Sequence, residues 1–167
     1  VVLGSLKQPA QWAEMPFHFG VTPLPVQRMD QLIRDDLFAG RDRPTLQPAV
    51  LSGMVNGFID LVFHHDGRYW VLDYKSNRLD HYGTEALQNA LLEKRYDVQS
   101  VLYMLALHRL LKVRLSDYDP ARHLGGAAYL FIRGIGSAGA GVVMQQPSAQ
   151  LIITLDVLMG ADAGGVA

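Results

Sequence analysis

The stretch GFIDLVFHHDGRYWVLDYK, residues 57–75, decides the fold of this chain. It is rich in β-branched and aromatic residues, which is typical of strands. Asp66-Gly67 lies in its middle, and this dipeptide is a strong signal for a two-residue hairpin turn. The sequence therefore predicts two antiparallel strands over residues 54–74 that are joined at this turn.

The turn also fixes which residues face each other across the hairpin. Counting outward from it along both strands places Asp60 directly opposite Asp73. Because side chains alternate along a strand, Asp60, Asp73 and Lys75 share one face. The residues of the other face are apolar or aromatic: Ile59, Leu61, Phe63, Trp70, Leu72 and Tyr74. We expect that second face to pack against helices, which turns both carboxylates to the opposite side of the sheet.

The rest of the chain predicts a mixed α/β domain without repeats. Periodic apolar positions predict helices over residues 26–38, 84–114 and 149–159. Short apolar runs predict strands over residues 14–21, 126–133 and 142–146. Gly40 is the expected C-cap of the first helix, and Thr84 is the expected N-cap of the second.

Composition limits the classes of function. A chain of 167 residues fits one domain, and none of its apolar runs is long enough to span a bilayer. The chain has no cysteine, which excludes a disulfide framework, a thiolate zinc site and a thiol nucleophile. Its net charge of −1 lacks the basic excess of an autonomous nucleic-acid binder, so we expect any DNA substrate to be delivered by another domain.

Asp60 and Asp73 predict a site for a positive charge. Directly opposed like charges destabilise a sheet, so we expect a cation between them. Lys75 is one candidate and Mg²⁺ is the other, and the two are compatible. A cation there can activate water, while Lys75 orients that water or neutralises charge in the transition state. The alternative is a surface salt-bridge cluster without a catalytic role, and spacing alone does not choose between them.

These motifs resemble a known family. Residues 57–63 and 69–77, followed by Arg95-Tyr96-Asp97-Val98-Gln99 and by Tyr103, resemble the nuclease domains of the RecB-like branch of the PD-(D/E)XK superfamily. The resemblance covers residues 54–158, continuing through residues 105–109, 117–119 and 125–134, and residues 1–50 are less certain. It implies one nuclease domain over residues 1–167, with a restriction-endonuclease-like fold in which helices flank a central mixed β-sheet.

The resemblance also assigns roles to individual residues. It implies that Asp60 and Asp73 ligate Mg²⁺, for which Mn²⁺ can substitute, and that the backbone carbonyl of Tyr74 assists. Lys75 is then the catalytic lysine. The family also uses a histidine ligand from a helix upstream of the first strand, and that motif is not found in this chain. His18 lies in an expected strand and is better explained as a sheet residue.

Two interpretations remain open for the roles of three further residues. The resemblance implies that Gln99 and Tyr103, one helical turn apart, face the scissile strand, whereas spacing alone favours an ordinary helix-surface pair. Glu14 is either a further acid near the site or a charge at a strand edge. The chain begins at Val1 without an initiator methionine, so we expect a fragment of a longer helicase-nuclease that starts after the histidine helix.

The implied function is that of an exodeoxyribonuclease V type enzyme in a RecBCD-type complex. Such a complex processes double-strand breaks for recombinational repair in the bacterial cytoplasm. The expected partners are single-stranded DNA ends, helicase domains of the same polypeptide, RecC-like and RecD-like subunits and a RecA-type recombinase, but no membrane. The alternatives are a non-catalytic docking module in this truncated form, and a nuclease of the same fold that acts on RNA or a junction.

Overall fold

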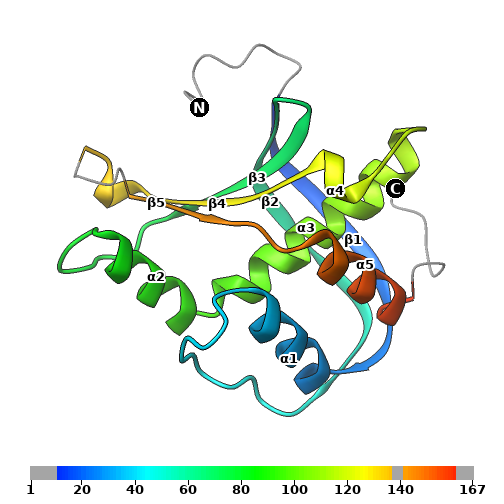
Figure 1. Ribbon diagram of the computed structural model, residues 1–167, viewed down its shortest axis with the longest axis horizontal. Coiled ribbons are helices and arrows are strands. Elements are labelled where there is room, and N and C mark those ends of the chain that lie inside the picture. Colours follow the sequence, from blue (N-terminus) through cyan, green and yellow to red (C-terminus); the bar gives the residue numbers. More distant parts are fainter. Residues whose placement is uncertain (1–10, 137–140, 161–167) are drawn as a thin grey trace.

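The computed structural model describes residues 11–136 and 141–160 (Figure 1). Its strands form one sheet in the order β1 (Gln11–Pro25), β2 (Val50–His65), β3 (Arg68–Lys75), β4 (Leu124–Phe131) and β5 (Val142–Gln145). Its helices are α1 (Val26–Asp36), α2 (Thr84–Glu93), α3 (Tyr96–Arg114), α4 (Pro120–His123), the short 3-10 helix η2 (Ile132–Gly134) and α5 (Ala149–Leu158). β3 and β4 are parallel and the other neighbours are antiparallel, which confirms the predicted mixed sheet with flanking helices.

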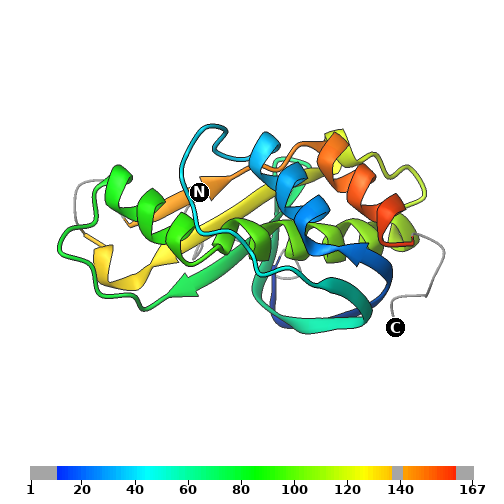
Figure 2. The same ribbon diagram turned by 90° about the horizontal axis from the view of Figure 1, so that it is seen from below.

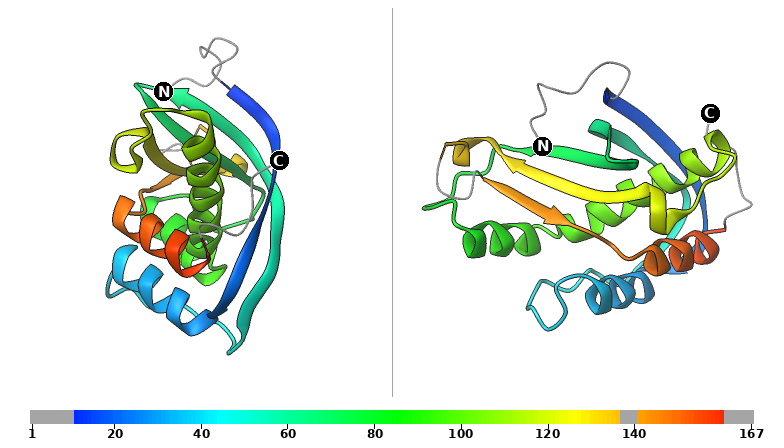
Figure 3. Two further views of the ribbon diagram at one scale, coloured as in Figure 1. Left: turned by 90° about the vertical axis from the view of Figure 1, so that its right-hand side faces the viewer. Right: turned by 45° about the horizontal axis from the view of Figure 1, so that its top comes forward.

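Helix α3 is the central helix of the fold. It lies between the sheet on one side and α1 and α5 on the other, and β1 and β2 bend around it (Figures 2 and 3). Most of its residues are buried, because it has packing partners on both sides. None of the helices in residues 11–136 and 141–160 is long and apolar enough to cross a membrane.

The predicted hairpin turn and register are confirmed. Asp66 and Gly67 both have positive φ angles, 49° and 72°, as a two-residue turn of this kind requires. Pairing between β2 and β3 runs from His65 opposite Arg68 to Leu61 opposite Leu72, with no shift. The ladder ends there, one pair before Asp60 and Asp73.

The prediction of which hairpin face meets the helices was wrong. Val62 and Val71 belong to the main core with α3, and they share their face with Asp73 and Lys75. The residues of the other face form a separate small cluster: Leu61, Phe63, Trp70 and Leu72, with Ala128 and Leu130. Both faces are apolar near the turn, so hydrophobic pattern did not decide between them. Asp73 and Lys75 therefore lie on the helix-covered face, where Asp73 reaches Tyr103 of α3.

The alternation of side chains along β2 breaks at Asp60. Ile59 and Val62 are both buried in the main core, although residues three apart in a regular strand point to opposite faces. Asp60 has no partner in either flanking ladder. In β1, Glu14 lies opposite it and has a φ angle of 50°, so both strands are irregular at the same level. This irregularity places Ile59 apart from Leu61, contrary to the expectation from strict alternation.

The predicted single helix over residues 84–114 is two helices. It breaks at Arg95, whose φ angle of 54° lies in the left-handed region. An arginine there is strained in backbone terms, and ion pairs to Asp30 and Asp97 hold it in place. The expected caps were also wrong: the α1 C-cap is Leu37 rather than Gly40, and the α2 N-cap residue is Gly83 rather than Thr84.

Candidate active site

Asp60 and Asp73 come from neighbouring strands and lie close enough for their charges to interact. Asp60 Oδ2 accepts a hydrogen bond of 2.9 Å from the Tyr74 backbone amide. The carboxylate thus occupies the place where the β2–β3 ladder would continue. This contact explains why the ladder ends before the two aspartates, and it fixes the direction of the Asp60 side chain.

Lys75 is enclosed by residues from three elements. Its Nζ lies 2.5 Å from Asp73 Oδ2 and donates a hydrogen bond of 2.9 Å to Gln99 Oε1. The same ammonium lies 3.8 Å from the centre of the Tyr96 ring and 5.1 Å from that of Tyr129. Lys75 is only 8% exposed, so its charge is held by contacts within the protein rather than by bulk water.

Gln99 and Tyr103 join this group from α3. Gln99 Nε2 donates to the Tyr103 hydroxyl at 2.9 Å, and that hydroxyl donates to Asp73 Oδ1 at 3.2 Å. A continuous chain of contacts therefore runs from Lys75 through Gln99 and Tyr103 to Asp73. The structure brings together the five side chains that the sequence selected, although it assigns no role to any of them.

Burial dominates the electrostatics of the site. It raises the pKa of the Asp73 carboxyl, which is only 6% exposed; Lys75 opposes this shift, and the negative charge of Asp60 adds to it. Burial also raises the pKa of the Tyr103 hydroxyl well above its usual value, and Asp73 adds to that shift. Tyr103 therefore stays protonated at neutral pH and acts as the donor to Asp73.

The donor set fits a hard divalent cation. Two carboxylates on adjacent strands, with the Tyr74 backbone beside them, offer the oxygen ligands that Mg²⁺ prefers. Among the described residues, no three His, Cys, Asp or Glu side chains are grouped to hold a metal ion. A cation here would take its other ligands from backbone carbonyls, water or a substrate phosphate, which is usual for Mg²⁺.

The other candidate ligands stand apart from the carboxylate pair. His18 lies in β1 with an exposed side chain, as predicted for a sheet residue. Glu14 is exposed on β1, an edge strand, although the register places its backbone opposite Asp60. His108 is buried against Tyr118 and Asp156 at the far end of α3.

Two open cavities flank α3. The first, about 390 Å³, lies beside Gln99 and Tyr103 and is lined by residues 55–57 of β2 and by Arg95. The second, about 500 Å³ and mostly apolar, lies towards the other end of the helix, where Trp12 contributes to its lining. Only the first adjoins the candidate catalytic residues.

Two tyrosines of the site were missed by sequence reasoning. Tyr96 and Tyr129 stack with ring centres 5.6 Å apart, and the Tyr129 hydroxyl donates to the Tyr96 backbone carbonyl at 2.7 Å. Together they form the aromatic wall against which Lys75 lies. The available signal was that Tyr96 stands three residues before Gln99, on the same side of a helix.

The fold, with two carboxylates and a lysine on neighbouring strands, is of the PD-(D/E)XK type. The chain belongs to the PD-(D/E)XK nuclease superfamily, whose family profile matches residues 7–158. Nucleases of this superfamily are typically metal-dependent.

Three bacterial proteins named "RecBCD enzyme subunit RecB" are similar to this chain. The protein from Escherichia coli K12 is 43% identical over 165 residues, which cover 93% of this chain and 14% of the relative. The protein from Haemophilus influenzae is 42% identical, covering 86% and 12%. The protein from Mycobacterium tuberculosis H37Rv is 43% identical, covering 65% and 11%. The chain thus spans about a seventh of the length of the first of these relatives.

Proposed function

We propose that this chain is the nuclease domain of a helicase-nuclease similar to the RecBCD enzyme, and that it hydrolyses phosphodiester bonds in DNA. The observation that carries the proposal is the buried group in which Lys75 contacts both Asp73 and Gln99 beside Asp60. Lys75 and Asp73 are buried, and Asp60 beside them is half-buried, so the group holds one more negative than positive charge. A bound cation would offset this excess of negative charge. The names of the similar bacterial proteins supply the biological setting.

Asp60, Asp73 and the Tyr74 carbonyl are the proposed ligands of Mg²⁺, with Mn²⁺ as a substitute. A divalent cation at this point supplies Lewis-acid stabilisation of phosphate charge and lowers the pKa of a water molecule. The Tyr74 amide keeps the Asp60 carboxylate in place, and the Tyr103 hydroxyl does the same for Asp73. Both carboxylates are therefore oriented before substrate binds, which avoids reorganisation during the reaction.

Lys75 is the proposed catalytic lysine. Its ammonium is a point charge held at 2.9 Å from Gln99, and it orients the attacking water or neutralises charge on the phosphate. Gln99 and Tyr103 border the cavity of about 390 Å³ beside the site. We propose that this cavity admits the scissile strand, so that Gln99 contacts both the strand and Lys75.

The partners follow from the same setting. With a net charge of −1, the chain lacks the excess of basic residues that is usual in proteins that capture DNA without help. Helicase domains of the same polypeptide and RecC-like and RecD-like subunits would deliver single-stranded ends produced by unwinding. A RecA-type recombinase is the proposed recipient of the processed strand, and the bacterial cytoplasm is the proposed location.

The direct test is cleavage of single-stranded DNA by the full-length polypeptide with Mg²⁺. Asp73→Ala removes a proposed cation ligand, and we expect the rate to fall at least about 100-fold. Asp42→Ala is the matched control, because Asp42 is an exposed aspartate in the loop after α1. Equal rates for wild type and Asp73→Ala would refute the proposed mechanism.

Thermal melting separates a nuclease from a non-catalytic docking module. A cation that binds only the folded chain raises the melting temperature as its concentration increases. We expect Mg²⁺ and Mn²⁺ to raise the melting temperature of wild type and not that of Asp73→Ala. An unchanged wild-type melting temperature would favour the docking module.

A further inference from the structure

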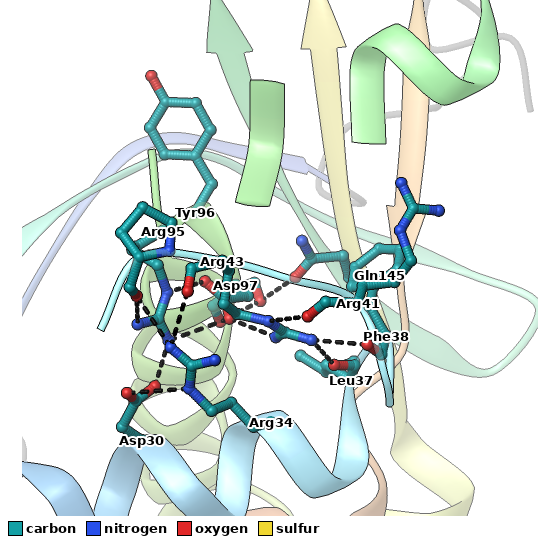
Figure 4. Close-up of polar contacts among 12 residues, drawn as sticks. Asp30, Arg34, Leu37, Phe38, Arg41, Arg43, Arg95, Tyr96, Asp97 and Gln145 are labelled. Carbon is teal, nitrogen blue, oxygen red and sulfur yellow. Dashed lines mark hydrogen bonds and ion pairs between the residues drawn. The ribbon is translucent and has the colours of Figure 1, made fainter. Parts of the chain in front are cut away.

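A group of buried ion pairs surrounds the start of α3. We call it the N-terminal anchor; its members are Asp30, Arg34, Arg43, Arg95 and Asp97 (Figure 4). Asp97 is fully buried, and it accepts from Arg43 at 2.7 Å and from Arg95 at 3.0 Å. Arg95 also pairs with Asp30. The anchor therefore joins α1 and the segment after it to the first turn of α3.

The two innermost arginines are fully engaged within the protein. Arg43 donates to Asp97 and to the backbone carbonyls of Leu37 and Phe38, at 2.6 and 2.7 Å. Arg95 donates to both aspartates and, at 2.8 Å, to the Pro44 carbonyl. Every guanidinium nitrogen of Arg43 and Arg95 has a partner, so neither offers the free forked edge with which arginine binds a phosphate. The anchor acts on the protein rather than on the substrate.

Added stability alone does not account for this arrangement. Removing charges from water costs about as much as their attraction returns, and apolar replacements of buried ion pairs are often neutral or stabilising. What arginine supplies is geometry, because its planar fork fixes the direction of several contacts at once. In this chain the fixed element is the first turn of α3.

That first turn supplies two of the contacts of Lys75. Tyr96 places its ring 3.8 Å from the ammonium, and Gln99 accepts its hydrogen bond. Asp97, the centre of the anchor, lies between these two residues in the sequence. A movement of the first turn therefore displaces both Tyr96 and Gln99 relative to Lys75, and Gln99 in turn holds the Tyr103 hydroxyl.

A second group of ion pairs lies towards the other end of α3 and offers a matched control. This C-terminal anchor consists of His108, Arg109, Lys112 and Asp156, where Asp156 lies on α5. Arg109 donates to Asp156 at 2.7 Å, and Asp156 is buried as Asp97 is. The two anchors therefore have similar chemistry, but only the N-terminal anchor adjoins the contacts of Lys75.

We propose that the N-terminal anchor positions Lys75 for catalysis by holding Tyr96 and Gln99 against its ammonium. Asp97 and Arg43 are thus positioning residues, not catalytic ones. The inference rests on the proposed nuclease function, and its test needs one readout that does not depend on cleavage.

The independent readout is the resonance of the Lys75 ε-methylene group. The Tyr96 ring lies over the ammonium, so ring current shifts this resonance away from its free-chain value. The chain has only four lysines, which makes selective labelling practical. We expect Asp97→Asn to move the resonance towards the free-chain value and Asp156→Asn to leave it in place. An unmoved resonance in folded Asp97→Asn, or an equal movement in both variants, would overturn the proposal.

Cleavage by the full-length polypeptide supplies the second readout. We expect Asp97→Asn to lower kcat about 10-fold to 100-fold with KM changed less than about threefold, because misplacement by about 1 Å is sufficient for such a loss. Asp156→Asn should keep kcat within about twofold. Arg43→Lys retains a cation for Asp97 and should recover part of the activity that Arg43→Met loses. Equal kcat values for Asp97→Asn and Asp156→Asn would overturn the proposal, because the N-terminal anchor would then contribute to the structure alone and not to the positioning of Lys75.

Two further results have defined meanings. If Asp97→Asn does not fold, Asp30→Asn replaces it, since Asp30 is an outer member of the anchor whose carboxylate accepts hydrogen bonds from Arg34 and Arg95. We then expect a smaller fall in kcat with the same movement of the Lys75 resonance. If wild type does not cleave DNA, the proposed function fails, and the resonance alone decides whether the anchor positions Lys75.

Discussion

Buried ion pairs hold both ends of α3, but the two ends differ in the residues that lie next to those pairs. At the start of the helix, Asp97 is buried among arginines next to the tyrosine and glutamine that contact Lys75. Towards its end, Asp156 is buried against Arg109 and His108, and these ion pairs join α3 to α5, away from the residues that contact Lys75. The comparison teaches that a buried ion pair does not mark a functional site by itself. Its neighbours decide what depends on its geometry.

The largest expected difference is between the lysines at the two ends. Lys75→Met removes a buried charge that contacts Asp73, and we expect kcat for DNA cleavage to fall at least about 100-fold. Lys112→Met removes a lysine 3.6 Å from Asp156 whose side chain is 55% exposed, and its rate should stay within about twofold of wild type. Similar losses from both variants would erase the distinction between the two ends.

A smaller difference is expected between the tyrosines. Tyr103→Phe removes the hydroxyl that donates to Asp73, and we expect kcat to fall about tenfold, the effect of one hydrogen bond. Tyr118→Phe removes a hydroxyl 2.8 Å from His108 and should change only stability, by about 1 kcal/mol. Steady-state kinetics and melting curves of both variants make the comparison. A large kinetic loss in Tyr118→Phe would extend the functional site to the far end of α3.

The third difference concerns pH and stability rather than rate. Burial opposes ionisation of Asp156, but its hydrogen bonds to His108 and Arg109 outweigh burial and lower its pKa to about 2. Because the folded-state pKa of Asp156 is lowered, the ionised carboxylate stabilises the folded state at every pH above its ordinary pKa of 3.8. This contribution to the free energy of unfolding is lost as the pH falls from 3.8 towards 2. We expect Asp156→Asn to cost about 2 kcal/mol at neutral pH and progressively less between pH 4 and 2. Denaturant curves at several pH values measure this, and a constant difference would contradict the assignment.

The sequence was informative where one local signal determined the structure. Asp66-Gly67 specified the turn, and the turn specified the register that brings Asp60 and Asp73 together. Lys75 follows from the same alternation, since it lies two residues after Asp73. Gln99 and Tyr103 required the family resemblance, because their spacing alone fits any helix surface.

The remaining features depend on contacts between distant segments. The break between α2 and α3 lies at Arg95, which pairs with Asp30 and Asp97. Local helix propensity cannot predict such a break, because it does not depend on partners from other segments. Val62 and Val71 face α3 although the opposite face of the hairpin is equally apolar. The position of the central helix, which decides this choice, is a property of the assembled fold.

The most direct test of the account is Mg²⁺-dependent DNA cleavage by Asp60→Asn in the full-length polypeptide. The asparagine side-chain oxygen can still accept the hydrogen bond from the Tyr74 amide, so the variant removes the charge while keeping the backbone contact. We predict an unchanged melting temperature without Mg²⁺ and a loss of cleavage of at least about 100-fold. Cleavage within about twofold of wild type would contradict the claim that Asp60 and Asp73 form the catalytic centre.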